Sequence, residues 1–278
     1  MLFSDPVTRE PFMNDADFPL VVADDVWLNG PYGPLFVRRW RNSAESALAP
    51  MVLLHDSLGC VELWRDFPAR LCAATGRDVI AYDRPGFGRS AARQDPLALD
   101  FIEAEAREVF PWLQEQLVLT DFIALGHSVG GSMAVHFAAG SVACQAVITI
   151  AAQACIEPRI LQGIRQARQQ FQDPQQFARL QKYHGDKAEW VLNAWIDTWL
   201  NPDFADWSLA ATLPRVACPL LAIHGEHDEY GSEQQPNMLV ALSGGQAQRE
   251  IMAKTGHVPH RESPSQLVQR VADFVLVC

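Results

Sequence analysis

The chain has 278 residues, of which 49% are hydrophobic, and a formal net charge of −11. That length and apolar content can form the core of one large domain or of two smaller ones. Because the net charge is negative and no basic stripe occurs, the sequence argues against binding to nucleic acid or to an anionic membrane surface.

Targeting and redox signals also limit the class of protein. Residues 1–20 lack the positive leader and the continuous apolar stretch of a signal peptide, and no segment reaches the roughly 18 apolar residues of a membrane span. The six cysteines form no C-x-x-C pair and lie mostly in apolar stretches, which indicates neither a disulfide framework nor a zinc site. We therefore expect a soluble, cytoplasmic protein.

The predicted elements begin with a hairpin over residues 19–41, where apolar and polar residues alternate on both sides of an Asn-Gly-Pro-Tyr-Gly turn. Short apolar runs then alternate with longer segments at helical spacing. A run that is apolar on both faces is typical of a strand in a parallel sheet covered by helices on both sides. The predicted strands are residues 51–57, 78–84, 122–128, 145–152, 219–225 and, more weakly, 249–254.

One connection is too long for an ordinary crossover. More than 60 residues separate the predicted strands at 145–152 and 219–225. Asp173-Pro174 predicts one helix start, and the spacing of Asp186 and Glu189 is that of a capping box. We interpret residues 153–207 as an inserted helical cap on a core domain of residues 1–152 and 208–278. Four of the eight tryptophans lie between positions 190 and 207.

Ser128 is the first candidate catalytic residue. It lies in Gly126-His127-Ser128-Val129-Gly130, at the end of a predicted buried strand and before a helix expected to begin near Gly131. Small neighbours are needed where a nucleophile sits on a sharp strand-to-helix turn, because bulky ones would clash with the strand and the helix. The N-terminal amides of the helix can then stabilise developing negative charge.

A serine hydroxyl needs a base, and the base needs an orienting acid. Asp228 follows the predicted strand 219–225, and His257 follows the strand at 249–254. Both would emerge at the carboxyl edge of the sheet, where Ser128 also lies. The sequence thus predicts a Ser128–His257–Asp228 triad.

Five motifs in this order resemble the α/β-hydrolase family, in its esterase, lipase-like and C–C hydrolase branch. The resemblance covers roughly residues 20–278 and implies the α/β-hydrolase fold, with a mostly parallel central sheet, helices on both faces and a helical cap inserted where that family carries its lid. The motifs are HDSLG (55–59), DRPGFGRS (83–90), GHSVGG (126–131), HGEHD (224–228) and GHVPHRESP (256–264).

The resemblance also implies an oxyanion hole. Its two donors would be the backbone N–H groups of Ser57, with Leu58 as a second candidate, and of Val129. The sequence differs from the family at Asp56, where glycine is usual. A carboxylate at that place would hinder catalysis unless it turns away or pairs with a cation such as Arg84.

Other interpretations of single residues are weaker. His127 is expected to be a core residue, and His260 is a less favoured alternative to His257 as the base. His224, His227, His257, His260 and Asp228 could be drawn as a metal cluster, but they lack ligand spacing, so we expect no metal and no cofactor. GFGRSA (86–91) imitates a dinucleotide fingerprint but fits a turn better.

The predicted function is a serine hydrolase that cleaves a small carboxylic ester or a related carbonyl substrate through an acyl-enzyme, with an apolar or aromatic small molecule as the substrate. C–C bond hydrolysis of a vinylogous diketone, thioester hydrolysis and acyl transfer use the same triad and remain alternatives. A non-catalytic ligand-binding protein on this fold is a further alternative, since fold does not fix function. The sequence leaves the oligomeric state open.

Overall fold

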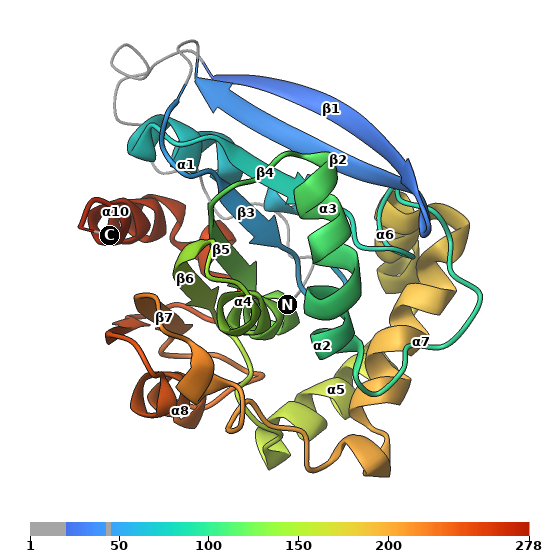
Figure 1. The fold of residues 1–278 in the computed structure, drawn as a ribbon. Helices are drawn as coiled ribbons and strands as arrows, with labels where there is room; N and C mark the ends of the chain where they lie inside the picture. Colours follow the sequence, from blue (N-terminus) through green and yellow to red (C-terminus); the bar gives the residue numbers. More distant parts are fainter. Residues whose placement is uncertain (1–20, 43–45, 278) are drawn as a thin grey trace.

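A twisted sheet runs through the centre of the computed structural model, which describes residues 21–42 and 46–277 (Figure 1). Within these residues the sheet has eight strands in the order β1-β2-β4-β3-β5-β6-β7-β8, and the six strands from β4 to β8 are parallel. The strands are β1 (Val21–Gly30), β2 (Gly33–Asn42), β3 (Met51–Leu54), β4 (Val79–Tyr82), β5 (Phe122–His127), β6 (Cys144–Ile150), β7 (Leu220–Gly225) and β8 (Ala247–Met252).

The predicted hairpin and the six predicted strands are confirmed. β1 and β2 pair antiparallel around a turn in which Gly30 lies opposite Gly33, and Gly33 has a φ of +76°. β3, β4, β5 and β7 are buried along their whole length, as expected for parallel strands covered on both sides.

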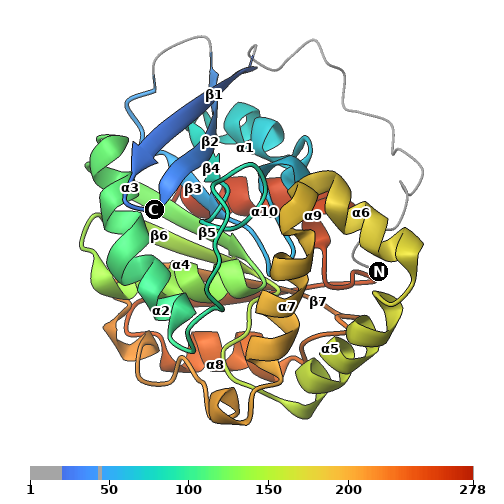
Figure 2. The same ribbon diagram turned by 90° about the vertical axis from the view of Figure 1, so that its right-hand side faces the viewer.

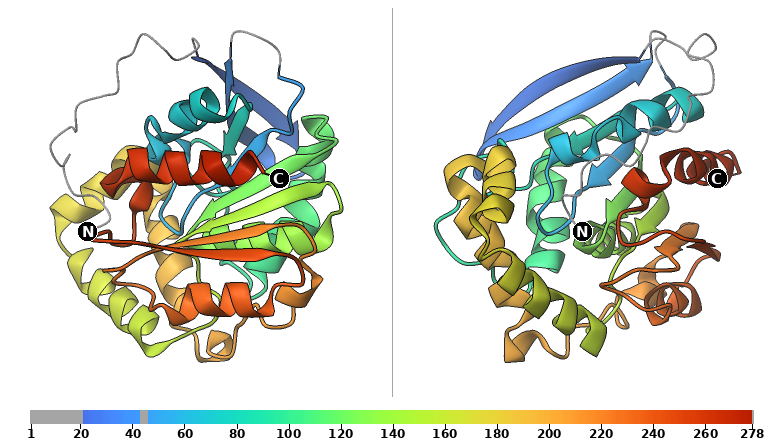
Figure 3. Two further views of the ribbon diagram at one scale, coloured as in Figure 1. Left: turned by 90° about the vertical axis from the view of Figure 1, so that its left-hand side faces the viewer. Right: turned by 180° about the vertical axis from the view of Figure 1, so that it is seen from behind.

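Helices cover both faces of the sheet (Figures 1 and 3). Successive side chains of a strand point to opposite faces of the sheet, so one apolar strand contributes to the core on both sides. In β3, Val52 and Leu54 belong to one apolar cluster, and Met51 and Leu53 belong to the other. On one side lie α1 (Phe67–Thr75) and α10 (Pro264–Val275), and on the other lie α2 (Phe101–Ala104), α3 (Phe110–Gln116), α4 (Val129–Gly140) and α8 (Gln234–Leu242). Shorter helices are η1 (Val61–Trp64), the π-helical η2 (Glu105–Val109), η5 (Leu213–Arg215) and α9 (Pro259–Glu262).

The segment between β6 and β7 forms a helical layer at one end of the sheet, seen in yellow and gold in Figure 2. We call residues 153–207 the cap segment. Its helices are α5 (Pro158–Gln170), α6 (Pro174–His184), η3 (Gly185–Lys187), α7 (Ala188–Trp199) and η4 (Pro202–Phe204).

Of the two predicted helix starts in the cap segment, one is confirmed and one is wrong. Asp173 caps α6 as predicted, because its carboxylate accepts a hydrogen bond from the Gln175 N–H at 2.9 Å. The predicted capping box of Asp186 and Glu189 is wrong. Asp186 lies in the short helix η3, and α7 begins at Ala188 with no side-chain cap.

Across the described ranges, 21–42 and 46–277, none of the helices combines the length and the apolar character that a membrane crossing needs.

Candidate active site

Ser128 lies on a sharp turn between β5 and α4. Its φ of 55° and ψ of −126° are unusual for a residue with a side chain. The turn depends on close approach of the backbone, since a Cβ atom on Gly130 would lie 2.1 Å from the carbonyl oxygen of Leu54. α4 begins at Val129, two residues earlier than expected, so the N–H of Val129 opens the helix directly beside the serine.

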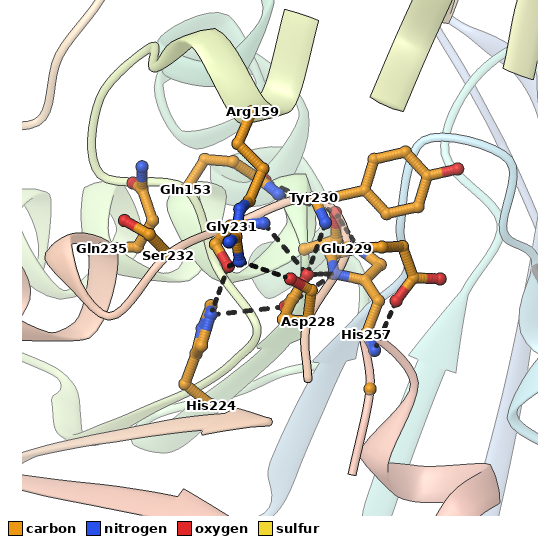
Figure 4. A network of polar contacts seen from close by, with 12 residues as sticks. Gln153, Arg159, His224, Asp228, Glu229, Tyr230, Gly231, Ser232, Gln235 and His257 are labelled. Atoms are coloured by element: carbon orange, nitrogen blue, oxygen red, sulfur yellow. Dashed lines mark hydrogen bonds and ion pairs between the residues drawn. The ribbon is translucent and has the colours of Figure 1, made fainter. Parts of the chain in front are cut away.

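Asp228 follows β7 and is almost completely buried. Its Oδ1 accepts hydrogen bonds from the backbone N–H groups of Tyr230 and Gly231, at 2.7 and 3.0 Å (Figure 4). Burial alone would raise the pKa of this carboxyl. The charge of His257 and the hydrogen bond to it, with further help from His224 and the Tyr230 amide, outweigh burial and hold the pKa below its usual range.

His257 follows β8 and joins the other two residues. Its Nδ1 lies 3.0 and 2.9 Å from the two carboxylate oxygens of Asp228, and its Nε2 lies 3.1 Å from Ser128 Oγ. Burial would lower the pKa of the ring, but the charge and hydrogen bond of Asp228, with the charge of Glu229, raise it. The structure therefore brings together the three residues that the sequence predicted, in an arrangement that can move a proton from Ser128 to His257.

The HDSLG loop lies beside this arrangement. The Nε2 of His55 accepts a hydrogen bond from the Arg84 N–H at 3.1 Å, and its Nδ1 lies 2.8 Å from the Asp56 carbonyl oxygen. Arg84 also donates from Nη2 to the same carbonyl at 2.9 Å. Ser57 lines the pocket next to Ser128, and within the described chain its N–H and that of Val129 have no hydrogen-bond acceptor. Both amides are thus available to a ligand.

The Asp56 carboxylate does not pair with Arg84, which binds only the main chain of this residue. Its Oδ2 lies 3.4 Å from Nδ1 of His127. Burial would raise the pKa of Asp56, but the hydrogen bond and charge of His127, and the charge of Arg261, hold it well below the usual range. His127 is buried as expected, yet it also contacts His257: its Nε2 lies 2.8 Å from the His257 carbonyl oxygen.

Gln153 is a site residue that the sequence reasoning missed. It follows β6 and is 3% exposed, and its side-chain amide lies 3.3–3.4 Å from Ser128 Oγ. Its place directly after the predicted strand at residues 145–152, at the same edge as Ser128, was the available signal. The contact to Ser128 comes from His257, and the ring of His260 packs 4.7 Å from those of Trp64 and His127.

A pocket opens above Ser128 between the core and the cap segment. It contains about 360 Å³ of unfilled space, including the part that is open to solvent. Asp56, Ser57, Leu58, Ser128, Gln153, Tyr230 and His257 line it from the core, and Ile160, Ile164, Trp195 and Trp199 line it from α5 and α7. The cap side is therefore wholly apolar, and the polar groups converge at Ser128.

No cluster in the described part of the chain suits a metal ion: there, three or more His, Cys, Asp or Glu side chains never gather as ligands would. The GFGRSA segment is mostly buried and forms turns, and the Asp83 carboxylate accepts hydrogen bonds from the N–H groups of Val61 and Arg89.

Residues 51–270 match the alpha/beta hydrolase family, and the chain therefore belongs to that family. A curated relative, the 1-acylglycerol-3-phosphate O-acyltransferase ABHD5 of Sus scrofa, is 35% identical over 88 residues, which are 32% of this chain and 25% of the relative. The chain thus matches about a quarter of the length of this relative.

Solved structures show the same fold. A membrane phospholipase A, described as a bacterial virulence factor, has a TM-score of 0.70 at 18% identity, over 91% of this chain and 86% of its own. A thermophilic esterase from Thermogutta terrifontis has a TM-score of 0.67 at 18% identity, over 91% of this chain and 98% of its own. At such identities the likeness concerns the fold alone.

Proposed function

We propose that the protein is a serine hydrolase that cleaves a small carboxylic ester or a related carbonyl compound. The observation that carries this proposal is the series of contacts from Asp228 through His257 to Ser128 Oγ, at 2.9 and 3.1 Å, beside an apolar pocket. A neutral imidazole oriented by a buried carboxylate is the base that a serine nucleophile requires.

The chemistry follows from these contacts. Ser128 Oγ bonds to the carbonyl carbon while its proton passes to His257 Nε2, and the negative charge on the carbonyl oxygen is stabilised by the N–H groups of Ser57 and Val129. His257 then gives the proton to the departing alcohol, which leaves an acyl-enzyme. Water then attacks the acyl-enzyme, with His257 again accepting and returning the proton, and the acid and free Ser128 are released. Asp228 stabilises the charged ring throughout.

The substrate is proposed to be mainly apolar, with one hydrogen-bonding group near the scissile carbonyl. Ile160, Ile164, Trp195 and Trp199 provide apolar and aromatic surface. The Gln153 amide has only long contacts with Ser128, so it can bind a hydroxyl, keto or alkoxy group of the substrate. The cap segment would act as the lid that encloses the acyl or alcohol part.

The test is hydrolysis of p-nitrophenyl acetate, butyrate and octanoate by the wild type and by Ser128→Ala, combined with intact mass after fluorophosphonate labelling. We expect turnover and a single label in the wild type and neither in the variant. If the wild type neither turns over nor becomes labelled, the proposal is wrong, and ligand binding without turnover is the remaining interpretation of the fold.

Acyl transfer is a second candidate, supported by the 88-residue match to a protein named an acyltransferase. Transfer would deliver the acyl group from Ser128 to an alcohol in place of water. Adding glycerol or a lysophospholipid to the butyrate assay would then produce the corresponding ester at the expense of free acid. An unchanged acid yield would contradict transfer and leave hydrolysis.

A further inference from the structure

The carboxylate of Asp56 requires an explanation that the three predicted catalytic residues do not supply. It lies next to the proposed oxyanion donor Ser57, and its side chain is 13% exposed. A negative charge at this place costs desolvation energy and would repel the oxyanion that the site must stabilise. A compensating role would account for an acidic residue here.

The hydrogen-bond geometry of His127 defines the partner of that charge. A carbonyl oxygen can only accept, so the contact of 2.8 Å between His127 Nε2 and the His257 carbonyl means that Nε2 carries a hydrogen and donates it. The other ring nitrogen, Nδ1, faces Asp56 Oδ2 at 3.4 Å. A ring with hydrogens on both nitrogens donates to both of these oxygens, whereas His257 donates to Asp228 and accepts from Ser128.

The main chain around His257 is held by side chains from several parts of the chain. The His257 N–H donates to Glu229 Oε2 at 3.2 Å, as Figure 4 shows. The N–H groups of Gly256 and Val258 donate to the two oxygens of Glu262, at 2.6 and 2.9 Å. His127 provides a further contact, to the carbonyl of His257 itself.

We propose that Asp56 and His127 are positioning residues, a second carboxylate–imidazole pair that fixes the main chain of His257 relative to Ser128 and to the oxyanion loop. Asp56 adjoins Ser57, His127 adjoins Ser128, and the carbonyl belongs to His257, so the pair connects the three loops that carry the reacting groups. This inference rests on the proposed function, because its consequence is the rate of attack by Ser128.

Several other groups surround the pair and bear on any pH dependence. The His260 ring from α9 lies 4.7 Å from that of His127, and the Trp64 ring from η1 lies 6.3 Å from it. His257 contacts the ring as well, at 5.1 Å between centroids. The charges of Arg261 and His55 act on Asp56. Asp56 itself contributes to the raised pKa of His257, after the larger effects of burial, Asp228 and Glu229.

The test compares Asp56→Asn, His127→Gln and the double variant with the wild type. Asp197→Asn, which removes an exposed ion pair of the cap segment, is the matched control for loss of one carboxylate. We expect kcat on p-nitrophenyl butyrate and the fluorophosphonate labelling rate to fall about 10- to 100-fold in each single variant, with KM changed less than about twofold. The double variant should be no worse than the more impaired single one, since the residues act as a unit.

Two further measurements separate positioning from general loss of structure. Asp56→Asn should move the acid limb of the kcat/KM profile to lower pH, which a merely destabilised enzyme would not do. In protein containing ¹⁵N-labelled histidine, the Nδ1–H resonance of His257 should shift in Asp56→Asn and stay unchanged in Asp197→Asn. Circular dichroism and melting temperature identify variants that fail to fold; if His127→Gln is one of them, Asp56→Asn decides.

The experiment separates an error in the positioning role from an error in the proposed hydrolase function. A wild type that neither labels nor turns over contradicts the hydrolase proposal, while the His257 resonance still reports on the pair. A wild type that labels, with Asp56→Asn and His127→Gln labelling at the same rate and an unshifted resonance, overturns the positioning role alone.

Discussion

Ser128 is one of the residues with a strained backbone. Its φ of 55° and ψ of −126° lie in a region that glycine occupies much more easily than residues with a Cβ atom. The turn brings Oγ to the pocket, so strain at this residue serves the position of the nucleophile. A residue that relieves the strain should stabilise the protein even as it removes the hydroxyl.

We predict that Ser128→Gly is more stable than Ser128→Ala by about 1 kcal/mol. Relief of strain contributes about 1–3 kcal/mol, and the greater freedom of glycine in the unfolded chain removes up to about 1 kcal/mol of that gain. Urea unfolding of the two variants, both inactive, measures the difference directly. Higher stability of the alanine variant would show that the turn is not strained.

The pH dependence of activity should report on His257. The ring must be neutral to accept the Ser128 proton, and Asp228 and Glu229 raise its pKa above the usual 6.5 against the effect of burial. A raised pKa means that the charged form of the ring persists to higher pH. We therefore predict that kcat/KM is at its maximum at alkaline pH and falls as pH decreases, with a midpoint above 6.5.

Glu229→Gln tests the cause of that midpoint. It removes one of the charges that raise the pKa while keeping a side chain that can accept from the His257 N–H, so the midpoint should move to lower pH. Profiles for the two proteins with p-nitrophenyl butyrate provide the measurement. An unshifted midpoint in the variant would exclude Glu229 as a determinant.

The three catalytic residues that the sequence predicted share one property: each follows a strand and lies within a recognisable local motif. Ser128, Asp228 and His257 could be placed together because parallel strands present their carboxyl ends at one edge. Gln153, His127 and Asp56 could not be assigned in the same way, because their roles depend on where a side chain points. Sequence suggested Arg84 as the partner of Asp56, whereas the carboxylate faces His127.

α5 and α7 form the cap side of the pocket. Ile160 and Ile164 lie one turn apart on α5, and both line it together with Trp195 and Trp199 of α7. The same side chains are buried in the core of the cap segment. Substitutions here should therefore change specificity and stability together.

We predict that Ile164→Ala raises the ratio of kcat/KM for octanoate over butyrate about tenfold and lowers the free energy of unfolding by about 2–4 kcal/mol. The smaller side chain lengthens the pocket and leaves a cavity in the folded state. Arg165→Ala, on the exposed side of the same helix, is the control and should change neither quantity. A shift toward acetate would mean that Ile164 does not limit the acyl chain.

Strands and helices could be predicted where a short stretch of the sequence carries a clear hydrophobic pattern. Apolar runs predicted the inner strands of the parallel sheet clearly, because burial on both faces leaves a strong pattern, whereas the partly exposed edge strand β8 gave a weaker signal. The start of α7 was not predictable, since Gly185, with a φ of +58°, ends α6 and leads into η3 without a gap. The capping-box spacing at Asp186 therefore falls inside a turn.

The attachment of the cap segment to the core involves the buried histidine His184. His184 Nδ1 accepts a hydrogen bond from the Gly88 N–H at 2.9 Å, and its Nε2 donates to the Leu58 carbonyl at 3.0 Å. Leu58 belongs to the HDSLG loop, so α6 is bound to the loop that also carries Ser57. Lys187 adds contacts to the Phe87 and Ser90 carbonyls.

This attachment should weaken in acid. Burial lowers the pKa of His184 to about 4, and protonation would remove the acceptor for the Gly88 N–H. Because the folded-state pKa lies below the unfolded value of about 6.5, the unfolded chain binds more protons between the two. The stability that neutral His184 contributes is therefore complete above pH 6.5 and is lost as pH falls from about 6.5 to about 4.

We predict that His184→Asn makes the protein less sensitive to acid. Between pH 7.5 and pH 5 the wild type should lose about 2 kcal/mol more of its free energy of unfolding than the variant does, as measured by urea unfolding at both values. His55, His224 and His260 also have lowered pKa values, through burial, but they are present in both proteins and cancel in the comparison. At pH 7.5 the variant should be the less stable protein, because it lacks the full pair of contacts. Equal losses in the two proteins would show that His184 does not carry the acid sensitivity of the contact between cap and core.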